Sequence, residues 1–140
     1  MCIRDSFYTV QASLKPHQRF ELEYQISDDV IDSIEPVEGS KRILKQRVQQ
    51  ALGIWHFTSR DSVRTIWQLT STRRAPSLWE QPVSAYDSND TVSIVYGHRR
   101  GLGTNFYAGF NWSRVRDRDA GIRTYQTEFF VKGSWAFDVL

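Results

Sequence analysis

The sequence predicts an all-β fold: an antiparallel up-and-down meander of about seven strands, forming an incomplete C-terminal part of a transmembrane β-barrel. Apolar and polar residues alternate along seven segments, as in strands with one apolar face. The connections between the segments alternate between short and long. Aromatic residues make up 14% of the chain and fall mostly within the segments, which is typical of strands that carry aromatic belts at membrane interfaces.

The connection lengths predict how the strands run. Outer-membrane barrels have tight periplasmic turns and longer external loops. If the C-terminus is periplasmic, all short connections fall on the periplasmic side and all long ones outside. The short connections are 15–18, 58–61 and 99–103, and the long ones are 28–41, 72–90 and 114–124.

Composition limits the class of protein. The chain has 140 residues, 40% of them hydrophobic, and a mean hydropathy of -0.49. It has no run of about 18 apolar residues, which a membrane-spanning helix needs. A barrel strand escapes that test because only alternate residues face lipid. The net charge is +2, from 18 basic and 16 acidic residues mixed along the chain, and this balance predicts no nucleic-acid partner.

The first six residues, MCIRDS, resemble translated sequencing-adaptor read-through. We therefore expect residues 1–6 to be an artefact, residues 7–140 to be the barrel segment, and the biological chain to extend upstream. A truncated start accounts for the lack of a signal peptide, whereas a genuine start at Met1 would agree with a soluble cytoplasmic protein. Cys2 is the only cysteine, so no disulfide is expected in residues 7–140.

The first two segments, 7–14 and 19–26, alternate most regularly. In 19–26, Glu21 and Glu23 fall on the side opposite the apolar residues, where a helix would scatter them. The apolar sets are Tyr8, Val10, Ala12 and Leu14, followed by Phe20, Leu22, Tyr24 and Ile26.

The third segment, 43–57, is the least regular. Its aliphatic residues share one parity, while Trp55 and Phe57 take the other. A β-bulge near Gly53 would reconcile the two sets, and a helix over 41–52 is an alternative because that stretch also fits a helical period. The aliphatic residues are Leu44, Val48, Leu52 and Ile54.

The remaining segments are 62–70, 91–98, 104–113 and 125–139, and most reach the 9 to 11 residues of a tilted spanning strand. Their apolar positions are Val63, Thr65, Trp67 and Leu69, then Val92, Ile94 and Tyr96, then Phe106, Ala108, Phe110 and Trp112, and finally Phe129, Val131, Gly133, Trp135 and Phe137.

We expect the apolar sets to face lipid and the polar sets a watery lumen. The predicted directions put aromatic residues at both strand ends and smaller aliphatics such as Leu22, Ile94, Ala108 and Val131 between them, whereas Trp67 falls mid-strand and does not fit this pattern. The periplasmic girdle is Phe20, Phe57, Tyr96, Phe106 and Phe137, and the outer girdle is Tyr8, Tyr24, Trp112 and Tyr125. The lumen face carries Glu21, Glu23, Arg64, Gln68, Asn105, Asn111, Glu128 and Lys132. Because single-chain bacterial barrels have an even strand number of eight or more, seven strands predict that further strands are missing upstream.

Three stretches carry a resemblance to a protein family: 57–69, with Arg64 inside its second strand, the hairpin 91–111 and the closing strand 129–140. They resemble bacterial outer-membrane proteins that join an N-terminal carbohydrate-binding family 9-like domain to a C-terminal barrel, the domain of unknown function 5916. The resemblance implies an outer-membrane location and contact with lipid, lipopolysaccharide and the barrel assembly machinery. The chain ends in Leu140 rather than in the usual aromatic residue, and the carbohydrate association belongs to a region that this chain lacks.

Residues with catalytic or ligand chemistry form no recognisable site. His17, His56 and His98 are far apart and match no metal-ligand spacing, so we expect no catalytic residue, cofactor or metal. The acidic loops 87–90 and 117–121 favour turns, with Ca²⁺ or lipopolysaccharide bridging as the alternative. Five arginines near the outer strand ends favour solvated loops, with lipopolysaccharide phosphates as the alternative, and Trp79 is a candidate for stacking on a sugar. The arginines are Arg73, Arg74, Arg114, Arg116 and Arg118.

These observations favour the C-terminal part of an outer-membrane barrel that serves as an anchor or a channel. A soluble β-sandwich or small ligand-binding barrel is the alternative, because alternation alone does not distinguish a lipid-facing surface from a buried core. An enzyme domain is disfavoured by the lack of a catalytic constellation.

Overall fold

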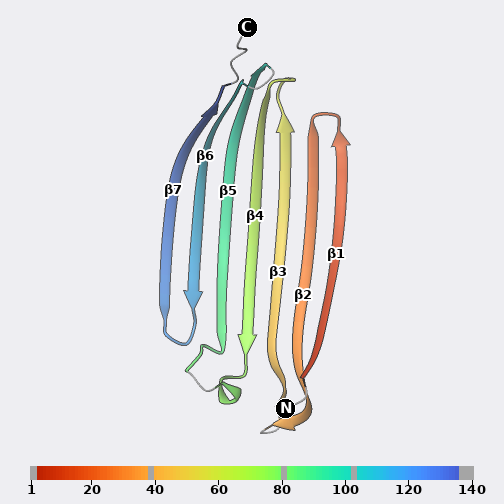
Figure 1. Cartoon of the computed structure of the whole chain (residues 1–140), viewed down its shortest axis with the longest axis vertical. Coiled ribbons are helices and arrows are strands. Elements are labelled where there is room, and N and C mark those ends of the chain that lie inside the picture. The colour runs from red at the N-terminus through yellow and green to blue at the C-terminus, as the bar shows by residue number, and fades with distance from the viewer. Residues whose placement is uncertain (1–2, 38–39, 80–81, 102–103, 136–140) are drawn as a thin grey trace.

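Seven strands follow one another in a single sheet in the computed structural model, which describes residues 3–37, 40–79, 82–101 and 104–135 (Figure 1). A three-residue 3-10 helix, η1 (Pro76–Leu78), lies between β4 and β5. The strands are β1 (Ile3–His17), β2 (Phe20–Val37), β3 (Ser40–His56), β4 (Asp61–Arg74), β5 (Tyr86–Gly101), β6 (Thr104–Asp117) and β7 (Ile122–Ser134).

Every strand pairs antiparallel with its neighbours in sequence, in the order β1-β2-β3-β4-β5-β6-β7. The predicted up-and-down meander of seven strands is therefore confirmed. Within the described part of the chain the sheet is open, with β1 and β7 at its edges, as expected for an incomplete barrel. Among these residues, no helix has the length and apolar character to cross a membrane.

The strands are longer than predicted, and only one of the three connections predicted to be long, that between β4 and β5, is long in the structure. The predicted alternation of short and long connections is therefore wrong at the other two. β2 continues to Val37 and β3 begins at Ser40, which turns most of the expected loop 28–41 into paired strand. Cross-strand ion pairs, such as Arg42–Asp32, explain why polar residues remain in the ladder. The connection expected at 114–124 shrinks to 118–121, and that at 72–90 shrinks to 75–85. We call the end with these three connections the loop end, and the opposite end the turn end.

β3 is a strand throughout, and neither the helix over 41–52 nor the bulge near Gly53 is present. Gly53 pairs directly with Leu22 of β2 and Thr65 of β4, within unbroken registers on both sides. Because β2 and β4 fix the register of β3 here, the two sets of apolar residues on β3 lie on opposite faces. Trp55 shares a face with Phe20, whereas Leu44, Val48, Leu52 and Ile54 lie on the other face.

The sheet has almost no hydrophobic core. Among the described residues, Ile43 is the only buried hydrophobic residue. The chain exposes 10501 Å², whereas a compact soluble protein of this mass exposes about 7,500 Å². A single layer leaves both faces of the sheet uncovered, so the functional surface has to be sought on the faces themselves.

Candidate functional site

The registers divide the strands into an apolar face and a polar face, because residues directly opposite each other in a ladder share a face. A complete row of the apolar face, from β1 to β7, is Leu14, Leu22, Gly53, Thr65, Ile94, Phe110 and Phe129. A row of the polar face is Ser13, Glu23, Leu52, Ile66, Ser93, Asn111 and Glu128. The eight polar residues predicted to share a face do so.

The apolar face carries a continuous hydrophobic band. A run such as 20–26 rises about 20 Å at about 3.4 Å per residue, close to the apolar belt of about 25 Å on membrane barrels. Charged residues bound the band at the loop end, and Asp61 and His98 lie beyond it on β4 and β5 at the turn end. We call it the apolar band, formed by the alternate, apolar-face residues of 10–14, 20–26, 49–55, 63–69, 92–96, 106–112 and 125–131.

Large side chains of the apolar band are open to the surroundings. Phe129 is 77% exposed and Val131 is 70% exposed, although both lie within the sheet. Ring contacts such as Phe110–Phe129, with centroids 5.2 Å apart, connect neighbours within the face but cover little of it. The apolar face therefore lacks a partner within the described residues.

The girdle residues that belong to strands lie on this one face. Phe57 follows β3 in the turn, with its ring centroid 6.0 Å from that of Trp55, and Phe137 is outside the described residues. Phe110 and Phe129 lie between the two groups. Trp67, which the sequence places mid-strand, points its indole N–H toward the loop end and donates to Asp90 Oδ1 at 2.9 Å. Its ring lies in the band while its polar atom reaches the charged border, an arrangement typical of interfacial tryptophan.

The polar face is lined mostly by amides, hydroxyls and charged groups, with cross-strand bonds such as Gln11–Glu23 at 2.6 Å. Two aromatic rings on this face lie over glycines of the neighbouring strand. Tyr107 covers Gly97, where an added Cβ would lie 3.2 Å from the ring, and Phe130 covers Gly109 even more closely. The glycines thus allow the rings to lie flat against the sheet.

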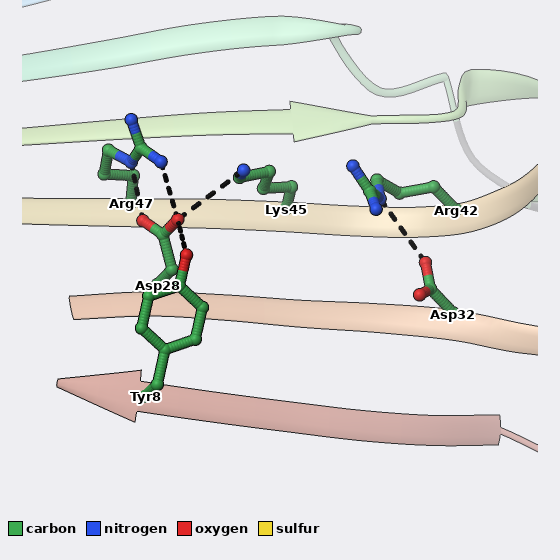
Figure 2. Close-up of polar contacts among 6 residues, drawn as sticks. All are labelled: Tyr8, Asp28, Asp32, Arg42, Lys45 and Arg47. Carbon is green, nitrogen blue, oxygen red and sulfur yellow. Dashed lines mark hydrogen bonds and ion pairs between the residues drawn. The ribbon is translucent and has the colours of Figure 1, made fainter.

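At the loop end of the apolar face, Asp28 organises a charged cluster and is completely buried (Figure 2). Its carboxylate accepts two hydrogen bonds from Arg47, at 2.6 and 2.7 Å, and one from the Tyr8 hydroxyl at 2.6 Å. Lys45 Nζ lies 3.5 Å from the same carboxylate. The hydrogen bonds from Arg47 hold the pKa of Asp28 well below its usual range, so Asp28 is ionised at neutral pH.

A second cluster lies at the same end, on β4, β5 and β6. Arg114 Nη2 donates to Asp90 Oδ2 at 2.6 Å, and the Arg114 guanidinium lies 5.5 Å above the Trp112 ring. Asp90 and Asp87 belong to β5 rather than to a loop, which corrects the prediction of an acidic loop over 87–90. Alternation puts Asp87 on the polar face, where it pairs with Arg74.

At the turn end, Asp61 accepts hydrogen bonds from Thr58 and Tyr96, both at 2.6 Å, and its Oδ1 lies 2.6 Å from His98 Nδ1. These hydrogen bonds, with Thr58 the largest contributor, lower the pKa of Asp61 well below its usual range. Asp61 thereby links the β3–β4 turn to β5.

The loop segments are tied to one another. Asp117 accepts a hydrogen bond from Ser84 at 2.5 Å and from the Ala120 amide at 3.0 Å. These hydrogen bonds lower the pKa of Asp117, and the one from Ser84 contributes most. Asp119 accepts a hydrogen bond from the Ala85 amide. The acidic residues of 117–121 therefore cap the turn and the neighbouring loop.

The remaining predicted residues do not form one site. His98 pairs with Asp61, His17 accepts a bond from the Arg19 amide at 3.1 Å, and His56 lines an open cavity of about 390 Å³ with His98. Among the described residues, no three His, Cys, Asp or Glu side chains come close enough to hold a metal ion. Trp79 is exposed beside η1.

Sequence reasoning missed the Asp28 cluster because it assigned Asp28 to a loop. The signal was present: Asp28 continues the apolar parity of Leu22, Tyr24 and Ile26, and Tyr8 continues that of β1. A charged residue that ends an apolar series marks the border of the apolar face.

Comparisons with protein-family models, curated proteins and solved structures find no match to this chain.

Proposed function

We propose that this chain is part of a bacterial outer-membrane β-barrel, in which the apolar face contacts lipid and the polar face lines a watery interior. The observation that carries the proposal is the exposed apolar band on an open antiparallel sheet with almost no core. In this role the chain acts as a membrane anchor or as part of a channel wall.

The size of the exposed surface favours lipid over water. Soluble monomers rarely expose apolar patches larger than a few hundred Å², whereas the apolar band extends across all seven strands. An acyl-chain environment removes that cost because it is itself apolar. Trp67 and Arg114 at the band's border fit an interface where aromatic and charged groups meet headgroups.

The open edges also require partners. Unpaired backbone groups at β1 and β7 would cost several kcal/mol each in hydrocarbon. We propose that further strands of the same protein close the barrel and that the barrel assembly machinery inserts it. The relation to the domain of unknown function 5916, with a carbohydrate-binding family 9-like domain, is part of this proposal and rests on the sequence resemblance alone.

Insertion of the whole chain into vesicles tests the proposal. Tryptophan quenching by lipids brominated along their acyl chains reports whether an indole lies in hydrocarbon. Trp55, Trp67 and Trp112 lie on the apolar face, so we expect strong quenching that falls by most of its amplitude when all three are replaced by Phe. A chain that folds as a soluble monomer without detergent and is not quenched would contradict the proposal and favour a soluble ligand-binding domain.

A further inference from the structure

We propose that the loop end of the apolar face binds the phosphates of a phosphorylated, multiply acylated glycolipid, the lipid A part of lipopolysaccharide. The inference rests on the proposed membrane function and names the lipid that meets this border. Six basic residues of β3, β4, β6 and β7 lie on the apolar face beyond the apolar band, and we call them the cationic belt: Lys45, Arg47, Arg73, Arg114, Arg116 and Arg123.

Like charges face each other within the cationic belt. Lys45 of β3 pairs directly with Arg73 of β4, and Arg116 of β6 pairs directly with Arg123 of β7. Like charges directly opposite each other destabilise a sheet. Among the described residues, no carboxylate lies within ion-pair distance of Arg73, Arg116 or Arg123. An anion between such pairs would replace repulsion by attraction.

The Lys45–Arg73 pair lines a cavity large enough for a phosphate group. An open cavity of about 390 Å³ is lined by Lys45, Arg47, Ser71 and Arg73, together with neighbouring arginines. Arg47 is held by the buried Asp28 carboxylate, and Arg73 lies 5.8 Å above the Tyr86 ring (Figure 2 shows the Asp28 side). Cations held in place in this way, with a hydroxyl beside them, suit a phosphate group.

The basic residues lie next to the apolar band, and this favours an amphiphilic ligand over a free anion. Four of the lining residues, Lys45, Arg47, Ser71 and Arg73, lie on the apolar face directly beyond the apolar band, so a ligand with phosphates at Lys45 and Arg73 can lay acyl chains along Leu69 and Ile26. The six side chains of the cationic belt face the carboxylates of Asp28 and Asp90, while Asp32, the next carboxylate of this face on β2, pairs with Arg42, which is outside the belt. That excess fits a headgroup with more than one phosphate.

The test measures lipid A binding by the full chain in maltoside micelles, without divalent cations, by native mass spectrometry and by the ligand-induced rise in Tm. We expect R73Q to weaken binding about fivefold and K45Q/R73Q about thirtyfold, at about 1 kcal/mol per cation near a lipid surface. R64Q is the matched control, because Arg64 is an exposed arginine of the same strand on the polar face. It should bind as the wild type does.

Removing Arg73 also relieves repulsion, so the ligand-free Tm of R73Q should equal or exceed that of the wild type. Equal lipid A affinity in K45Q/R73Q and R64Q would overturn the inference, whereas the quenching experiment tests the membrane assignment separately. The affinity for dephosphorylated lipid A should be the same in R73Q and in the wild type. Inorganic pyrophosphate or phosphatidylglycerol binding as tightly as lipid A would overturn the glycolipid assignment.

Discussion

Gly109 shows how a single residue sets the packing of the polar face. It pairs with Phe130, and a Cβ placed at position 109 would lie 2.5 Å from Cε1 of the Phe130 ring. Gly109 has no positive φ, so the constraint comes from the ring above it and not from the backbone. A larger residue would displace the ring.

We therefore expect G109A to destabilise the fold by about 1–3 kcal/mol, as overpacking does. G53A is the control, since nothing lies within 4 Å of its added Cβ, and it should leave stability unchanged or raise it by about 0.5 kcal/mol. Urea unfolding in micelles measures both. If the ring is the cause, G109A should cost much less in an F130A background.

The two faces should also respond differently to charge. On the proposed lipid face, I94R or V131R should cost about 2–4 kcal/mol near the membrane midplane. Ser93 and Ser134 neighbour these strands' apolar positions but lie on the polar face, so S93R and S134R should cost much less. Reversible unfolding from vesicles gives the four values, and equal costs on both faces would contradict the assignment.

At the scale of elements, the β3–β4 turn depends on one carboxylate. The amides of Phe57 and Thr58 donate to the Asp61 carbonyl at 3.0 and 3.4 Å, while the Asp61 side chain holds Thr58, Tyr96 and His98. The lowered pKa of Asp61 means that its stabilising contribution is complete above the pKa of an unfolded aspartate, about 3.9. The contribution is lost as the pH falls below that value toward the folded-state pKa.

Amide hydrogen exchange of Phe57 and Thr58 should therefore show less protection below about pH 4 than above it, after correction for the intrinsic exchange rate. In D61N the protection of these amides should be lower at neutral pH. It should also change little between roughly pH 3 and pH 6, a range that includes the pKa of an unfolded aspartate. A pH profile of D61N that matched the wild type would assign the effect to another group.

β2 and β3 show why an element can run beyond its apolar pattern. Past Ile26 the shared face turns polar, yet the pairing continues to Val37 and Ser40. Asp28 with Arg47 and Asp32 with Arg42 replace apolar contacts by cross-strand ion pairs. A ladder needs only backbone partners and compatible side chains, so its end does not coincide with the end of the hydrophobic band.

For the whole molecule, the governing feature is one layer with two unlike faces. A soluble sheet covers its apolar face with a second layer, and within the described residues this sheet has none. The open edges at β1 and β7 would pair with other strands wherever they could. Both properties follow if the sheet is a wall segment of a larger closed barrel, as we propose.

Much of this fold could be predicted from the sequence because alternation reports strands directly. The seven strands, their antiparallel order and the shared face of residues such as Glu23 and Asn111 were predicted and are confirmed. The helix over 41–52, the bulge at Gly53 and the long loops over 28–41 and 114–124 were wrong. Local patterns could not reveal that β2 and β4 hold β3 in an unbroken register across Gly53.

By itself, the sequence determined the period of each strand and therefore which residues of one strand share a face, since successive side chains point to opposite sides. Only the tertiary structure decided how the faces of different strands line up. Register places Lys45 opposite Arg73, Asp28 beside Tyr8 and Phe130 over Gly109. These contacts join residues far apart in the chain, and a shift of one residue in pairing would move each of them to the other face.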